Sequence, residues 1–135
     1  PNALVVATNA SLAVERIGMP EAQIILAQAA AYVACAPKSN ASSGAIFKAM
    51  EAVGRTGNLP IPTHLQDAHY KGAAKLGHGT GYKYAHDYPN HYVEQQYLPY
   101  ELNGQEFYQP TGNGYEAKIR EHMKWLKEEA AKGRD

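Results

Sequence analysis

The hydrophobic pattern of the first residues predicts a helix over residues 2–17. Gly18 follows this run and provides a stop signal. The apolar positions recur loosely at three- and four-residue spacing, and together with one threonine they are Leu4, Val5, Thr8, Leu12 and Ile17.

A second helix is predicted over residues 20–36. Pro20 and Glu21 suit a helix start, where an N–H is unpaired anyway and an acid faces the positive end of the dipole. A helix that is apolar all round is normally covered by protein on every side. We therefore expect this helix to form the core, with Cys35 behaving as a small hydrophobic residue within it. Its larger apolar residues, set among many alanines, are Ile24, Ile25, Leu26, Tyr32 and Val33.

Two further helices are predicted before residue 77. Pro37 ends the second helix, and Ser39 or Asn40 is suited to cap a third over residues 40–56. The prolines at 60 and 62 make residues 58–62 extended, and a fourth helix is then expected over residues 63–76. Residues 1–76 would thus form a helical body. The apolar stripe of the third helix is Ala45, Ile46, Ala49, Met50 and Val53.

Composition changes abruptly after Leu76. Glycines and prolines interrupt residues 77–113, and eight of the ten tyrosines lie between residues 82 and 115. A long irregular segment must be held by its own side chains, and tyrosine offers both an apolar ring and a hydroxyl. We expect an irregular strap over residues 77–113, with ordered rings and a short hairpin near Phe107. An amphipathic helix over residues 114–132 should close the chain.

Charge and cysteine content change this picture little. The 135 residues hold 13 basic and 13 acidic side chains, so no overall field would attract nucleic acid or a membrane. A single cysteine indicates a reducing compartment, and the longest apolar run is too short to span a bilayer. The chain is expected to be cytoplasmic and to form one assembly domain over residues 1–135. Because it opens on Pro1 and passes at once into a helix, we also expect it to be a piece of a longer polypeptide.

Catalytic motifs are weak or missing. A nucleotide-hydrolysing site needs a glycine-rich loop that ends in Gly-Lys-Ser/Thr, and the run from Gly77 to Gly81 lacks the lysine. Lys38 and Ser39 could hold an anion at a helix start, but a helix cap is the favoured interpretation. We expect no ATP binding and no catalysis by this chain.

The six histidines suggest a metal site only superficially. Their spacing aligns no pair on one helix face, and no second cysteine accompanies them. His86 beside Asp87 resembles an acid–base pair, but no nucleophile motif accompanies it. Structural hydrogen bonding among Tyr82, Tyr84 and His86 is favoured.

Nucleic-acid binding is a stronger alternative. Between residues 38 and 83 six basic residues stand against two acidic ones, and aromatic residues that could stack on bases follow directly. The stretch from Tyr84 to Tyr108 carries four acidic residues and no cation, which opposes a dedicated groove. If the chain makes a weak DNA contact, we expect four of these cations to make it: Lys48, Arg55, Lys71 and Lys75.

Several short sequence motifs along the chain closely resemble those of one family. They are Pro20-Glu21-Ala22, Leu26-Ala27-Gln28, Ala36-Pro37-Lys38-Ser39-Asn40, His64-Leu65-Gln66-Asp67-Ala68-His69-Tyr70, Gly81-Tyr82-Lys83-Tyr84-Ala85-His86-Asp87, Gln95-Gln96-Tyr97-Leu98-Pro99 and Tyr108-Gln109-Pro110. In this order they resemble the C-terminal region of replication-associated recombination protein A (RarA, also MgsA), a family that includes the Werner-helicase-interacting ATPases. The sequence departs from the family at Gln66, where arginine is expected, and at Ala85, where proline is expected.

The resemblance implies a parent protein with an AAA+ ATPase module that binds ATP and magnesium and acts on DNA at stalled replication forks. It also implies a helical domain similar to a clamp-loader collar that holds the parent together as a homotetramer. Single-strand-binding protein and DNA are implied as partners of the parent, which would be associated with the nucleoid. The resemblance gives structural or interface roles, and no catalytic role, to Lys38, Ser39, Asn40, His64, Asp67, Tyr82, Lys83, Tyr84, His86, Asp87, Gln96, Tyr97 and Pro99.

Three hypotheses follow from the sequence. The favoured one is an oligomerisation module whose interface is built by the apolar helices between Asn2 and Val53. The second is a module that docks DNA or a replication protein through the basic residues of 38–83. The third, a small enzyme using His86 and Asp87, is the weakest.

Overall fold

The computed structural model describes residues 1–132 and is mainly helical, as the sequence predicts. Its four α-helices are α1 (Asn2–Ile17), α2 (Ala22–Cys35), α3 (Ala41–Thr56) and α4 (Tyr115–Lys132). Five short 3₁₀ helices lie between α3 and α4, and no strand occurs among these 132 residues, so the hairpin expected near Phe107 is absent.

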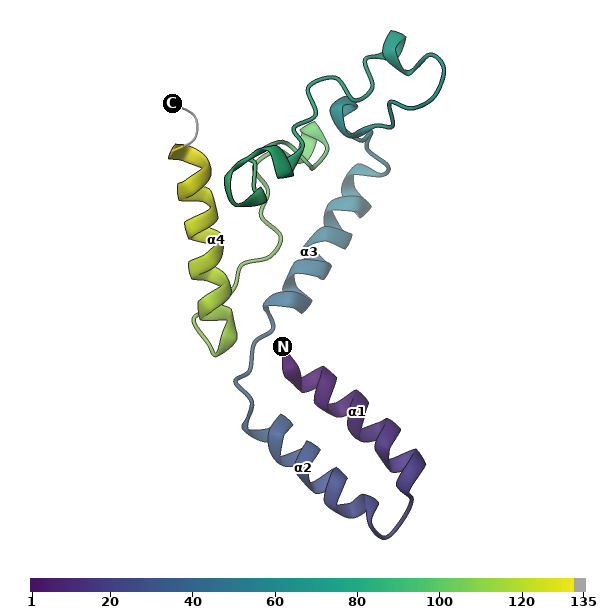
Figure 1. The fold of residues 1–135 in the computed structure, drawn as a ribbon, viewed down its shortest axis with the longest axis vertical. Coiled ribbons are helices and arrows are strands. Elements are labelled where there is room, and N and C mark those ends of the chain that lie inside the picture. Colours follow the sequence, from purple (N-terminus) through teal and green to yellow (C-terminus); the bar gives the residue numbers. More distant parts are fainter. Residues whose placement is uncertain (133–135) are drawn as a thin grey trace.

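Helix packing is confined to the first two helices. α1 and α2 form an antiparallel hairpin, and neither α3 nor α4 packs against another helix in the described chain (Figure 1). The turn between α1 and α2 contains Gly18, whose φ of 75° is readily adopted by glycine. The four helices therefore do not close into one bundle within a single copy.

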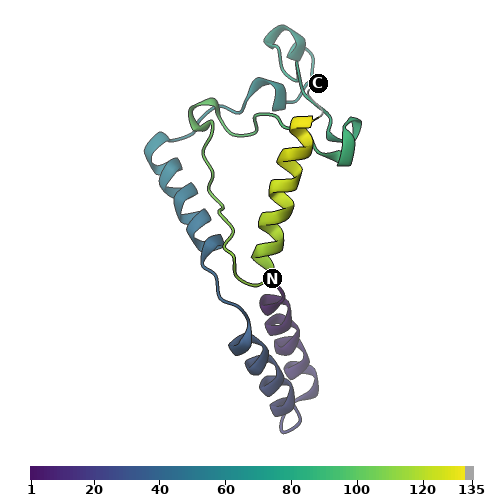
Figure 2. The same cartoon turned by 90° about the vertical axis from the view of Figure 1, so that its left-hand side faces the viewer.

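The molecule has an open shape. The hairpin lies at one end, the loops that follow α3 lie at the other, and an irregular segment before α4 descends between α3 and α4 (Figures 1 and 2). The start of α4 is held against the linker between α2 and α3, where a Cβ placed on Gly114 would lie 2.7 Å from Cβ of Pro37. This junction positions the hairpin relative to the rest of the chain.

The helix predicted over residues 63–76 is wrong. Only two 3₁₀ turns form there, Thr63–Leu65 and Ala73–Leu76. Asp67 accepts a hydrogen bond from the backbone N–H of His69, and Gly72 has a φ of 100°. Both features oppose a continuous helix, because an Asx turn diverts backbone donors and a left-handed residue reverses the chain.

The irregular strap over residues 77–113 is present, but its rings are less buried than the sequence suggested. Tyr82, Tyr84, Tyr97 and Tyr100 are all at least half exposed. The segment contributes only Val93 and Leu102 to the buried set. Side-chain amides hold the backbone instead, because the Gln95 amide both accepts from the N–H and donates to the carbonyl of Lys83.

Candidate functional site

One uncovered feature of the chain is a set of bulky apolar side chains on α3. An adjacent side of this helix carries alanines, of which Ala52 is buried and Ala45 and Ala49 are half-buried. The bulky residues therefore face solvent, with Phe47 68% and Met50 63% exposed. We call these four residues the α3 stripe: Ile46, Phe47, Met50 and Val53.

α1 turns a different face toward α2 than its bulky residues predict. Ala10 is buried, and Val6 and Val14 are half-buried on the inner side. Leu4 and Val5 are exposed, with Leu4 at 76%. Small residues let two helices approach closely, which explains why alanine rather than leucine occupies the contact.

The prediction that the second helix forms the core is wrong for a single copy. Only Ala22 of α2 is buried, whereas Ile24 is 76% exposed and Cys35 is exposed. One neighbouring helix covers one side, and no other part of the described chain covers the opposite side. The apolar outer side of α2 is thus a surface that one copy leaves in water.

A shallow groove of about 430 Å³ runs between the two helices of the hairpin. Ser11 is its single polar residue, and small side chains make up most of the lining. The lining from α1 includes Ala7, Ala10 and Val14, and that from α2 includes Leu26, Ala30 and Val33. We call it the hairpin groove.

A polar junction centred on Glu116 connects the hairpin, the strap and α4. Its Oε2 accepts hydrogen bonds from Oγ of Ser39 at 2.7 Å and from N and Oγ1 of Thr111 at 2.9 and 2.7 Å, and its Oε1 accepts one from the Tyr108 hydroxyl at 3.2 Å. These bonds, led by that from the Thr111 hydroxyl, lower the pKa of Glu116 to about 2. Glu116 also lies in the first turn of α4, where the helix dipole favours a negative charge.

The first family-motif residues lie at the same junction. Nζ of Lys38 donates to carbonyls at the end of α2, including Ala36 O at 2.9 Å, and so caps that helix. Ser39 Oγ accepts from the N–H of Ala41 at the start of α3. Asn40 lies before α3, and its carbonyl accepts from the N–H of Gly44.

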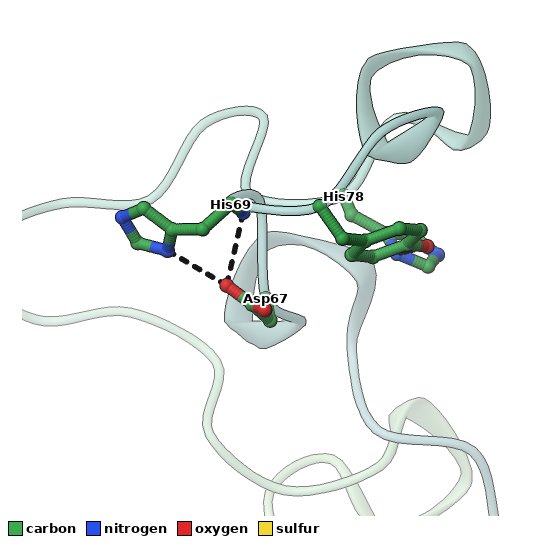
Figure 3. Close-up of polar contacts among 4 residues, drawn as sticks. Asp67, His69 and His78 are labelled. Carbon is green, nitrogen blue, oxygen red and sulfur yellow. Dashed lines mark hydrogen bonds and ion pairs between the residues drawn. The ribbon is translucent and has the colours of Figure 1, made fainter.

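Asp67 and His69 form a local pair on the surface (Figure 3). Oδ1 of Asp67 accepts from N of His69 at 3.0 Å and lies 2.7 Å from Nδ1. The backbone bond, followed by the ring contact, lowers the pKa of Asp67. His78 is instead 2.7 Å from the hydroxyl of Tyr70. Since the pair is exposed to solvent, its contribution is to shape the turn.

The remaining motif residues are distributed along the strap and meet at no single site. Nε2 of His64 is 2.7 Å from the carbonyl oxygen of Gln96, which fixes the strap to the loop after α3. The rings of Tyr84 and His86 lie 5.1 Å apart, and the rings of His86 and His91 4.8 Å apart. The other motif residues make local contacts. The backbone N–H groups of Tyr82 and Asp87 donate to the carbonyls of Gly79 and Tyr84, and the carbonyl of Pro99 accepts from the N–H of Leu102. The Tyr97 hydroxyl accepts from the side-chain amide of Gln95, which also pairs with the backbone of Lys83.

The four cations proposed for DNA contact are all exposed. Lys48 and Arg55 lie two helical turns apart on one side of α3, away from the α3 stripe. Lys71 and Lys75 lie in the loop region that follows. Within residues 1–132 none of the four has an ion pair with an acidic side chain.

Residues 1–132 contain no cluster of three or more histidine, cysteine or acidic side chains placed to hold a metal ion. None of the helices in that range is long and apolar enough to cross a membrane.

Sequence reasoning missed the residues that organise the junction, Thr111 and Glu116. The available signal was an acid in the first turn of a predicted helix, preceded by a Thr-Gly-Asn-Gly turn. That signal identifies a helix start, but it does not reveal that Ser39, 77 residues earlier, shares the same carboxylate.

Comparison with known proteins identifies relatives over nearly the whole chain. The family described as "MgsA AAA+ ATPase C terminal" matches residues 1–127. An AAA domain-containing protein of Mycobacterium tuberculosis is 50% identical over 121 residues, which cover 88% of this chain and 26% of that protein. Replication-associated recombination protein A is 48% identical over 107 residues in Bacillus subtilis (78% of this chain, 25% of that protein) and 38% over 130 residues in Escherichia coli K12 (96% and 29%). The chain thus spans about a quarter of the length of these relatives.

Proposed function

This chain belongs to the MgsA AAA+ ATPase C-terminal family, and from that premise we propose that it is the oligomerisation module of a DNA-dependent AAA+ ATPase. The parent protein would act in replication-fork maintenance, recombination and repair. The B. subtilis and E. coli relatives are named for replication-associated recombination, which supports the recombination role. ATP and magnesium would be bound by an AAA+ module outside this chain. The parent would be cytoplasmic and nucleoid-associated, with DNA and single-strand-binding protein as partners.

The observation that carries this proposal is the uncovered apolar surface of α1, α2 and α3. Monomeric proteins rarely leave this many large apolar side chains in water, because each of them gains about 1.5–3 kcal/mol on burial. Here bulky residues are exposed on three successive helices, including Leu4, Ile24 and Phe47. An interface with further copies of the chain would cover them.

We expect the isolated chain to self-associate, as a homotetramer, at micromolar concentration. Sedimentation equilibrium measures the mass directly, and the apparent mass should rise with concentration toward four times that of one chain. A single species of monomer mass at high micromolar concentration would exclude the oligomerisation role.

A second candidate function, docking of DNA, is supported by the four exposed cations without acidic partners. A cation that is not neutralised by a neighbouring carboxylate is free to replace a counterion on the phosphate backbone. Lys48 and Arg55 are the sharper test because they lie on one side of a rigid helix.

If these cations bind DNA, charge reversal of both, Lys48→Glu with Arg55→Glu, should weaken binding of single-stranded DNA by at least tenfold at low salt. The slope of log affinity against log salt should also fall by about 1.4, since two phosphate contacts are lost and each contributes about 0.7 on a single strand. Fluorescence anisotropy over a salt series measures both quantities. Lys118→Glu with Arg120→Glu on α4 is a control with the same charge change, and an equal loss in that variant would show only a net-charge effect.

A further inference from the structure

The proposed oligomerisation leaves open which surface of one copy meets which surface of the next. Each chain carries two uncovered apolar features of opposite shape. The α3 stripe is convex and bulky, whereas the hairpin groove is concave and lined mostly by small side chains. Neither packs on the other within one copy, because α3 does not contact α1 or α2.

We propose that the α3 stripe of one copy inserts into the hairpin groove of the next copy, in a head-to-tail contact. This inference rests on the proposed oligomerisation and specifies its geometry. The occupant of the groove is then a second copy of this chain.

The sizes of the two features agree. At 1.5 Å per residue the 16 residues of α3 extend about 24 Å, and the helices of the hairpin extend about 21–24 Å. A cavity of about 150 Å³ suffices to hold benzene. The groove of about 430 Å³ therefore has room for the ends of two or three side chains such as Phe47 and Met50.

The contact area is sufficient for a weak specific interface. Four large side chains that are 55–68% exposed would bury roughly 400 Å², and the groove would contribute a similar area. The total, roughly 800 Å² for each contact, lies below the standard size of about 1,600 Å². In a closed ring, however, every copy makes two such contacts, one through its stripe and one through its groove.

Polarity also favours this pairing. The groove has Ser11 as its single polar lining residue, and the stripe has no charged member. Lys48 and Arg55 lie on the other side of α3 and would remain in solvent. The stripe and the groove themselves therefore bring no charged side chain into the contact, and an unpaired buried charge would be the main obstacle to association. Glu51, four residues after Phe47, is exposed and lies at the edge of the stripe.

A mixing experiment with chain 1–135 distinguishes this contact from a symmetric one. Met50→Glu damages the stripe and leaves the groove intact, and Ala30→Glu damages the groove and leaves the stripe intact. Both positions are exposed in one copy, so neither change should unfold it. Each variant alone should show a dissociation constant raised at least 100-fold, because association would bury a carboxylate without a partner. Native mass spectrometry measures the species, and circular dichroism checks helicity.

Head-to-tail contact predicts that an equimolar mixture of the two variants forms a one-to-one heterodimer, joined by the single undamaged stripe and groove. A symmetric stripe-to-stripe contact predicts no heterodimer and no effect of Ala30→Glu. Ala30→Leu, which fills the groove without a charge, should also weaken association. Lys48→Glu on α3 and Gln28→Glu on α2 are matched controls that should assemble like the parent sequence.

The outcomes separate the two proposals. If the unmodified chain assembles but the mixture stays monomeric, or Ala30→Glu assembles normally, the head-to-tail contact is wrong while oligomerisation stands. If the unmodified chain is itself monomeric, the oligomerisation role and this contact both fail.

Discussion

Replacement of Gly114 by alanine is expected to lower the free energy of unfolding by about 2–5 kcal/mol. Two effects combine at this position. Gly114 has a φ of 53°, in the left-handed region that costs an L-residue about 1–2 kcal/mol. A Cβ there would also lie 2.7 and 2.8 Å from Cβ and Cγ of Pro37, and overpacking of this kind costs about 1–3 kcal/mol. Denaturant unfolding at fixed protein concentration measures the loss.

Two other glycines serve as matched controls for this prediction. Gly104 occupies the third position of a turn closed by Gln105 N–H to Leu102 O, with a φ of 78° and no neighbour within 4 Å of its Cβ position. Gly104→Ala therefore isolates the backbone term. Gly112→Ala meets only ordinary contact with Arg120 at 3.6 Å and should be nearly neutral. If Gly114→Ala is no worse than Gly104→Ala, α4 is not held tightly against the linker at Pro37.

The helices were predictable where glycine or proline stop signals agree with the spacing of the apolar residues. Gly18 and Pro37 fix the ends of α1 and α2 to within two residues of the observed bounds. The helix expected over residues 63–76 failed because apolar spacing was given more weight than Asp67 and Gly72, which favour turns. The hydrogen bond from the His69 N–H to the Asp67 side chain stabilises a turn where the apolar pattern predicted a helix.

Which residues are buried could not be read from the sequence. Hydrophobicity alone predicts that Ile24 and Leu4 are covered, yet in one copy alanines make the helix contact and the larger residues face outward. An apolar pattern shows which residues of a helix are hydrophobic, but it does not show which of them contact a neighbouring helix of the same chain. Cys35, at the end of α2, is exposed because it too lies outside the contact between the two helices.

The junction at Glu116 was equally out of reach. Its partners come from three separate segments, at Ser39, Tyr108 and Thr111. Spacing along a helix reports on neighbours three or four residues away, whereas this carboxylate collects donors that only the fold brings together. Two of the family motifs, the one that ends at Asn40 and the one that begins at Tyr108, contribute Ser39 and Tyr108 to the junction. The junction therefore explains these two motifs in structural terms.

Substitution of Glu116 by glutamine is expected to lower the thermal midpoint of unfolding at pH 7, and the difference should vanish as the pH approaches 2. The carboxylate accepts four hydrogen bonds, and glutamine replaces one accepting oxygen by an N–H₂ group that repels the donors of Ser39 and Thr111. Because the pKa of Glu116 is lowered from 4.5 to about 2 in the folded chain, its stabilising effect is present above pH 4.5. That effect is lost as the pH falls from about 4.5 toward 2.

The pH dependence is what distinguishes a carboxylate that organises the junction from a surface acid. Asp67 and Glu106 also have lowered pKa values, so the parent sequence and the Glu116→Gln variant both lose stability in acid. Only the difference in stability between the parent and the variant reports on Glu116. Differential scanning calorimetry from pH 7 to pH 2 measures that difference. Glu121→Gln removes an exposed carboxylate from the same helix, at a position without a hydrogen bond in the described chain, and should give the same midpoint as the parent sequence at every pH. A constant difference between Glu116→Gln and the parent down to pH 2 would mean that shape, and not charge, holds α4 to the hairpin linker.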